Sequence, residues 1–163
     1  MDEDRFWTMI EQAWRSVGGV LEARQALAAG KLSDERAEEL VDLCGGVIQA
    51  LQAELRKLPA DELMAFDRIL ERKLYEIDRA DVHEHIEGSD DGFLYALGFI
   101  VAAGKAYYDA VSANPSLAPM MDLECEEMCY LSWHLYQDKF GEMPRSSISR
   151  ESCSNQAGWQ EEG

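Results

Sequence analysis

The 163-residue chain lacks a long apolar run. Its longest apolar block spans residues 93–103, contains Gly98 and stops before Gly104. Because a membrane-spanning helix needs roughly 18 or more consecutive apolar residues, the sequence excludes such a helix. The segment 1–5 is acidic and lacks the basic start and apolar core of a secretory signal. We therefore expect a cytoplasmic protein.

Positive charge is also scarce. Fifteen Lys and Arg residues stand against 32 Asp and Glu residues, a net charge of −17, and between residues 81 and 142 only Lys105 and Lys139 are basic. Such a surface repels nucleic-acid phosphates and anionic lipid, so we expect neither a nucleic-acid nor a membrane partner. Two interpretations stay open: the acidic face maintains solubility, or it binds a basic protein.

Only four cysteines are present, and in a cytoplasmic protein we expect them to be reduced. Cys125 and Cys129 fall on one face of an expected helix, and His134 follows. His134 is nine residues from Cys125 and points the opposite way at about 100° per residue, so these residues do not converge on a metal. Buried thiols in the core are the expected role.

Apolar residues recur every three or four positions through most of the chain, which is typical of amphipathic helices. No stretch alternates as a strand does, and no internal repeat is present. The expected helices span about residues 4–17, 21–29, 34–58, 59–77, 89–103, 105–112 and 121–140. In the third of these, Gly45-Gly46 indicates a close helix contact or a kink. Along 121–140, the expected core-facing stripe comprises Met121, Cys125, Cys129, Trp133, Tyr136 and Phe140.

The helix expected at 89–103 has a start signal and a stop signal of its own. Ser89 is a good N-cap, Asp90 and Asp91 place negative charge at the positive end of the helix dipole, and Gly104 favours termination. Its body is apolar on nearly every side, so we expect it at the centre of a bundle. The predicted fold is an all-α, single-domain helical bundle around this buried helix, over residues 1–143. The polar segment 144–163 is predicted to be a mobile tail. Docking of its only large aromatic residue, Trp159, on the bundle or on a partner is the alternative.

The same region carries a resemblance. The residues concerned are Ser89-Asp90-Asp91-x-Phe93, Phe99-Ile100-Val101-x-x-Gly104, Tyr107-Tyr108, Asn114-Pro115 and an N-terminal Phe6-Trp7 pair. They resemble a bacterial domain-of-unknown-function family over roughly residues 4–140. The resemblance implies a small, soluble, all-helical domain, and it brings no established activity and no catalytic residue.

The best metal-like cluster is His83-Glu84-His85, with Glu87 and Asp90 nearby. His83 and His85 diverge by about 200° on a helix, whereas a metal needs several converging ligands. We therefore expect no metal and no cofactor.

A small-ligand site near the start of the central helix is the remaining candidate, formed by His83, Asp90, Asp91 and Tyr95. The two aspartates are equally explained as charges at the helix N-terminus.

No catalytic motif accompanies the uneven charge. The leading hypothesis is therefore a non-enzymatic interaction or regulatory protein whose acidic face meets a basic partner, and an immunity protein that blocks a basic toxin is one form of it. The alternative is an enzyme or a small-ligand or metal-binding domain with its site near His83, Asp90 and Asp91. The sequence leaves the oligomeric state open.

Overall fold

The computed structural model describes residues 1–86, 88–119 and 123–160, which form α-helices and one short 3₁₀ helix, with no strand among them. The predicted all-α fold is confirmed. The helices are α1 (Glu3–Ser16), α2 (Leu21–Ala28), α3 (Asp34–Leu55), α4 (Ala60–Ile77), α5 (Ala80–Ile86), α6 (Asp90–Ala102), α7 (Lys105–Ala113), η1 (Pro115–Leu117), α8 (Glu126–Phe140) and α9 (Gln156–Trp159). Within the described part of the chain, no helix is both long and apolar enough to cross a membrane.

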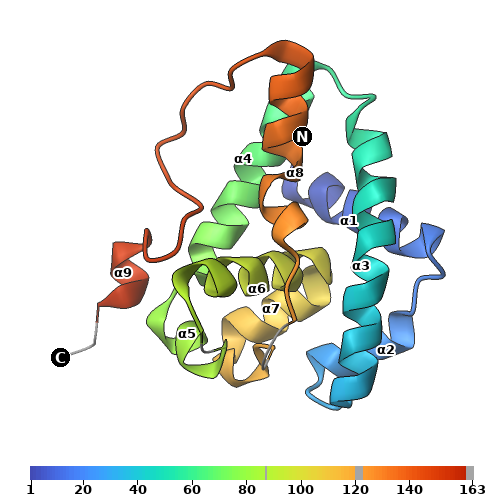
Figure 1. The fold of residues 1–163 in the computed structure, drawn as a ribbon, viewed down its shortest axis with the longest axis vertical. Helices are drawn as coiled ribbons and strands as arrows, with labels where there is room; N and C mark the ends of the chain where they lie inside the picture. The colour runs from blue at the N-terminus through green and yellow to red at the C-terminus, as the bar shows by residue number, and fades with distance from the viewer. Residues whose placement is uncertain (87, 120–122, 161–163) are drawn as a thin grey trace.

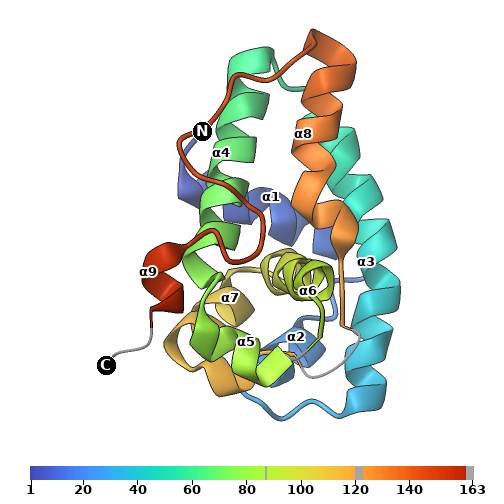
Figure 2. The same cartoon turned by 60° about the vertical axis from the view of Figure 1, so that its left-hand side comes forward.

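The three longest helices, α3, α4 and α8, run along the long axis of the molecule (Figure 1). The central helix α6 crosses them and is seen nearly end-on in Figure 2. Helix α8 packs against both α4 and α6, α1 packs against α3, and α2 packs against α7. The molecule is therefore one bundle around α6, as the sequence predicts.

Burial of α6 explains its apolar composition. Nine of its 13 residues are buried, and the Ser89 side chain caps it by accepting a hydrogen bond from the Gly92 amide at 3.2 Å. Gly98 lies where α8 begins. A Cβ at Gly98 would clash with the Cys125 carbonyl oxygen and would lie 2.6 Å from the Cys129 sulfur. Glycine at this position lets the two helices touch backbone to backbone.

Helix α3 continues as one helix through Gly45-Gly46. A Cβ at Gly46 would lie 3.0 Å from Val17 Cγ1, whereas a Cβ at Gly45 would meet nothing within 4 Å. Of the two alternatives for this pair, the close contact is therefore the one observed, and it lies between α3 and the end of α1.

One helix was not expected, and two expected boundaries were wrong, the first being the end of α3 at Leu55 instead of residue 58. Residues 80–86, expected only as a connection, form α5, which buries Val82 and Ile86 at a spacing of four residues. Helix α8 begins at Glu126 instead of Met121, because the Cys125 backbone is not helical and its amide donates to the Tyr95 carbonyl oxygen at 3.0 Å. Residues 121 and 122 lie outside the described part.

The core face of α8 also differs from the expected stripe. Its buried residues are Met128, Cys129, Leu131, Ser132 and Leu135. Trp133 and Tyr136 are half-buried, and Phe140 is 43% exposed. A series with four-residue steps rotates by about 40° at each step, so it leaves the core within a few turns.

The segment from residue 144 to α9 lies against the bundle through contacts that were not expected from the sequence. Arg150 is buried and donates to the Cys129 carbonyl oxygen and to Asp67, each at 2.7 Å. The Ser152 hydroxyl donates to the Asp90 carbonyl oxygen at 2.6 Å. We name residues 142–151 the strap, because they run beside α4 (Figure 2) and are joined to α8 through Arg150.

Candidate functional site

His83 and the two aspartates of the predicted site lie in different surroundings. His83 is half-buried on α5, with its ring 5.0 Å from that of Phe93 and 5.3 Å from that of Trp159. Asp90 and Asp91 are exposed in the first turn of α6. The structure shows no hydrogen bond or ion pair between His83 and either aspartate, so it supplies no contact that supports a ligand site there.

Tyr95, the fourth predicted residue, is directed toward α8. An interaction with the Glu126 carboxylate raises the pKa of Tyr95, and the negative charge of Asp91 acts in the same direction. Tyr95 and Asp91 therefore belong electrostatically to the acidic side of α8.

No metal centre is formed by the residues that the structure describes: among them, no three His, Cys, Asp or Glu side chains are grouped to hold an ion. Glu87, part of the predicted cluster, lies outside those residues. Cys125 is buried and His134 is exposed, so the two side chains do not converge, as expected from the sequence.

A groove between α3 and α8, which we call the α3–α8 groove, lies on the acidic side. Its floor is apolar and comprises Ile48, Leu131 and Leu135, which are 7%, 7% and 2% exposed. The hollow measures about 300 Å³. It offers apolar contact along two neighbouring helices.

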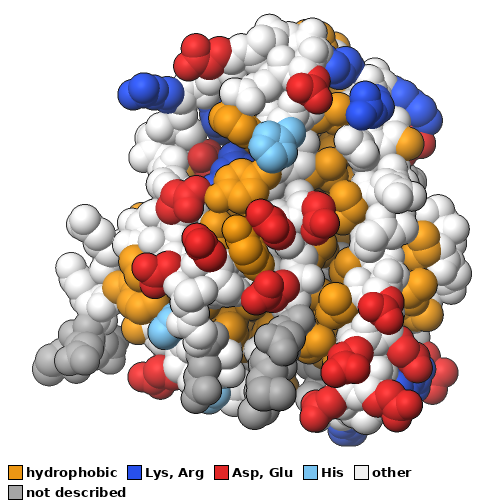
Figure 3. All heavy atoms as spheres, viewed as in Figure 1, with side chains coloured by type: hydrophobic (Ala, Val, Ile, Leu, Met, Phe, Trp, Pro, Cys, Tyr) orange, Lys and Arg blue, Asp and Glu red, His pale blue; other side chains and the backbone are white. Residues whose placement is uncertain are grey.

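The border of the groove is acidic. Glu126, Glu127 and Asp138 line it, together with His134, and none of its lining residues is Lys or Arg. None of the three carboxylates forms an ion pair within the described part of the chain. Figure 3 shows acidic side chains spread over this face, with apolar surface between them. No Lys or Arg therefore offsets the three carboxylates at the border of the groove.

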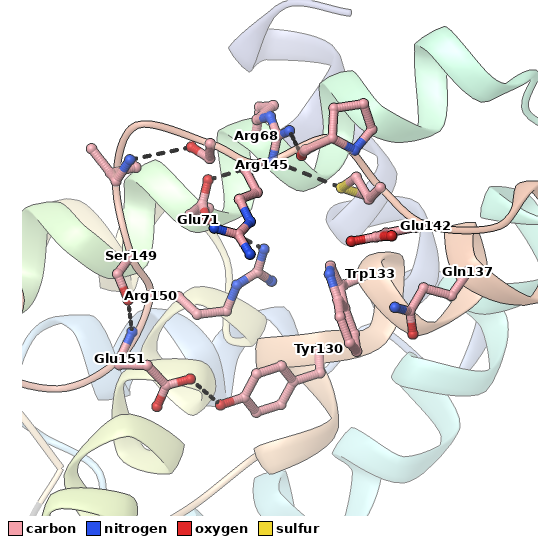
Figure 4. A pocket seen from close by; sticks show the side chains of 14 residues that line it. Arg68, Glu71, Tyr130, Trp133, Gln137, Glu142, Arg145, Ser149, Arg150 and Glu151 are labelled. Atoms are coloured by element: carbon pink, nitrogen blue, oxygen red, sulfur yellow. Dashed lines mark hydrogen bonds and ion pairs between the residues drawn. The ribbon is translucent and has the colours of Figure 1, made fainter.

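A second hollow, of about 490 Å³, lies between the strap and helices α4 and α8 (Figure 4). We call it the strap pocket. Its lining includes Arg68 and Glu71 from α4, Tyr130 and Trp133 from α8, and Arg145 and Arg150 from the strap.

The Tyr130 hydroxyl donates to Glu151 at 2.8 Å, and Arg68 donates to the Pro144 carbonyl oxygen, so both ends of the strap are attached. Sequence reasoning missed this pocket because its walls come from three distant segments, and no local spacing relates them.

The fold and these two hollows define an all-α helical domain with an acid-bordered surface groove. Residues 44–138 match the family model described as a protein of unknown function, DUF4240, and the chain belongs to that family. The predicted membership in a domain-of-unknown-function family is confirmed, and the match contains the segment from Ser89 to Asn114. No curated protein and no solved structure matches the chain.

Proposed function

We propose that this chain is a non-enzymatic interaction protein of the bacterial cytoplasm, which binds a basic segment of a partner protein in the α3–α8 groove. One observation carries the proposal. The groove has an apolar floor and a border of three carboxylates, and no lysine or arginine lines it.

The occupant that fits is an amphipathic helix with Lys or Arg beside its apolar face. The exposed parts of Ile48, Leu131 and Leu135 are small, so covering them adds a modest apolar contribution to affinity. Two helices that border a groove are a recurrent receptor for a third helix. The carboxylates at the border select the sign of the partner's charge more than they add affinity.

The net charge supports the same interpretation. At −17 the whole chain attracts a cationic partner over distance, which raises the association rate at low salt. An immunity protein that blocks a basic toxin is one form that this function takes, because a tight, salt-sensitive encounter with a basic surface is what such a protein requires.

The test uses a synthetic helical peptide with leucines on one face and lysines on the other. We expect saturable binding that weakens as salt rises. In a ¹H–¹⁵N spectrum the largest shifts should fall at Ile48, Leu131 and Leu135. The same peptide with glutamates in place of its lysines should not bind, and a scrambled lysine–leucine peptide should bind more weakly.

Matched charge reversals separate the groove from general acidity. Glu127→Lys should weaken peptide binding about fivefold, the order expected for a reversed exposed pair. Glu22→Lys changes the net charge equally, but Glu22 is an exposed residue of α2 outside the groove lining, so it should have little effect. Equal effects of the two variants, or peptide shifts centred elsewhere, would overturn the proposal.

A further inference from the structure

We infer that the strap pocket binds a small zwitterion of the amino-acid class, whose ammonium group donates to Glu71 and whose carboxylate pairs with Arg145. This site adjoins the α3–α8 groove, with Tyr130 lining both, but Glu71 and Arg145 lie outside the groove lining and the inference does not depend on the function proposed for the groove.

Glu71 is the group proposed to accept a hydrogen bond from the ammonium group of the ligand. It is 6% exposed, and no described residue donates a hydrogen bond to its buried Oε2. The nearest cations are too far away to form hydrogen bonds with Glu71. Arg68 Nη1 is 3.8 Å from Oε2, and Arg150 Nη2 is 3.7 Å from Oε1. Leaving a buried carboxylate oxygen without a donor is costly. A donor entering the pocket would remove that cost.

Both flanking guanidinium groups already have acceptors of their own. Arg68 donates to the Pro144 carbonyl oxygen and, at 3.8 Å, to the Met143 sulfur. Arg150 donates to Asp67 and to the Cys129 carbonyl oxygen. These bonds hold the two guanidinium groups at 3.8 and 3.7 Å from the Glu71 carboxylate. A ligand in the cavity that Glu71 lines would supply the closer donor that neither arginine provides.

Arg145 is the group proposed to pair with the carboxylate of the ligand. It lines the same cavity from the strap, is exposed, and makes no hydrogen bond or ion pair with any described residue. A guanidinium group with all its donors available matches a carboxylate in a two-point, planar geometry. The pocket therefore presents an unfilled acceptor and an unfilled set of donors.

The charge balance narrows the ligand class. Three arginines and three glutamates line the pocket, the latter being Glu71, Glu142 and Glu151. Because the lining carries no excess of positive charge, it does not suit a polyphosphate, which needs several unopposed cations. A ligand with one positive and one negative group matches both unfilled sites. The half-buried ring of Trp133 offers apolar contact for its side chain.

The experiment is a titration of the full chain with each common L-amino acid, followed by ¹H–¹⁵N spectra that include the indole signals. We expect at least one amino acid to bind saturably and to shift the Trp133 indole and Arg150. Two derivatives of that binder, the N-acetylated form without an ammonium group and the decarboxylated form without a carboxylate, should each bind at least tenfold more weakly. Equal binding of either derivative, or no saturable binding by any amino acid, would overturn the inference.

Two variants locate the ligand groups. Glu71→Gln and Arg145→Ala should each weaken binding at least tenfold, while Arg15→Ala, which removes an exposed arginine of α1 outside the pocket lining, should leave it unchanged. Arg145 is exposed, so its variant keeps the test decisive even if Glu71→Gln does not fold. Unchanged binding in Arg145→Ala overturns the assignment. Because the Lys–Leu peptide is monitored at the α3–α8 groove, failure at one site is distinguishable from failure at the other.

Discussion

Asp78 and Trp159 are joined across 81 positions of the chain: the indole Nε1 donates to Asp78 Oδ1 at 2.8 Å. The same carboxylate accepts from the backbone amides of Cys153, Ser154 and Asn155 at 2.9, 2.8 and 3.0 Å. Asp78 is 1% exposed, so a buried carboxylate at the end of α4 receives four donors from the C-terminal segment. This one residue explains why a polar segment without a core of its own lies on the bundle.

Asp78→Ala should release that segment. Bonds from neutral donors to a buried carboxylate are charge-assisted, so we expect the free energy of unfolding to fall by about 2–4 kcal/mol. In native-state hydrogen exchange, the amides of residues 153–155 should exchange much faster than in the parent chain. Asp42→Ala, at an exposed position of α3, serves as the control. Unchanged exchange at 153–155 would contradict the role given to Asp78.

Ser89→Ala should remove the N-cap of α6. The lost hydrogen bond to the Gly92 amide should lower the free energy of unfolding by about 0.5–2 kcal/mol. Asp91→Asn should cost about 0.3–1 kcal/mol, and this loss should shrink at high salt because it reflects the helix dipole. Thermal and urea melts measure both, with Ser147→Ala at an exposed strap position as control. An Asp91→Asn chain of full stability that has lost peptide binding would indicate a functional role for Asp91 instead of capping.

Two glycines inside helices should respond to alanine in opposite ways. Gly98→Ala places a methyl group against the Cys125 carbonyl oxygen and the Cys129 sulfur, and should destabilise the chain by about 1–3 kcal/mol because backbone cannot move aside cheaply. Gly45→Ala has open space and should stabilise it by about 0.5–1 kcal/mol. Denaturant melts of Gly98→Ala and Gly45→Ala measure both changes in the free energy of unfolding. Similar changes in the two variants would disprove the close α6–α8 contact.

The four thiols should react in two groups. Cys153 is exposed, whereas Cys44, Cys125 and Cys129 are buried, and burial also raises the pKa of Cys129. Since the thiolate is the reactive form, iodoacetamide should label Cys153 quickly in the native chain and the other three only on unfolding. Mass spectrometry of peptides after timed labelling measures this. Rapid native labelling of Cys129 would contradict the packing of α8 on α6.

The ion pair of Asp81 should make the free energy of unfolding slightly dependent on pH. Arg79 donates to both of its carboxylate oxygens, at 2.9 and 2.8 Å, and lowers the pKa of Asp81 below its ordinary value of 3.8. A carboxyl group whose pKa is lower in the folded state stabilises the fold above its ordinary pKa and loses this effect as the pH falls through the folded-state pKa. Asp81 is 55% exposed, so Asp81→Asn should cost only about 0.2–1 kcal/mol at neutral pH. In acid, the difference in the free energy of unfolding between Asp81→Asn and the parent chain should vanish. Urea melts at a series of pH values measure it, and a difference that persists in acid would contradict the prediction.

The elements that the sequence predicts well are those with local causes. Helix α6 was predicted with its cap because Ser89, the two aspartates and Gly104 act within one turn of its ends. Helix α8 was placed too early because the chain before it is fixed by a contact with Tyr95, which is 30 residues away in the sequence. Of the candidate site, Tyr95 could be related to the acidic face only after α6 and α8 were placed side by side.

By itself the sequence determined an all-α bundle, the burial of its central helix and the excess of negative charge, because periodicity and composition act through neighbours along the chain. The tertiary structure alone decided which acids border the α3–α8 groove, why Arg150 and Asp67 are buried together, and how Arg145 of the strap comes to line the same cavity as Glu71. These groups lie far apart in sequence. Their pairing is selected by the free-energy cost of burying a charge without a partner. That cost arises only when the helices pack, so it cannot be read from local sequence patterns.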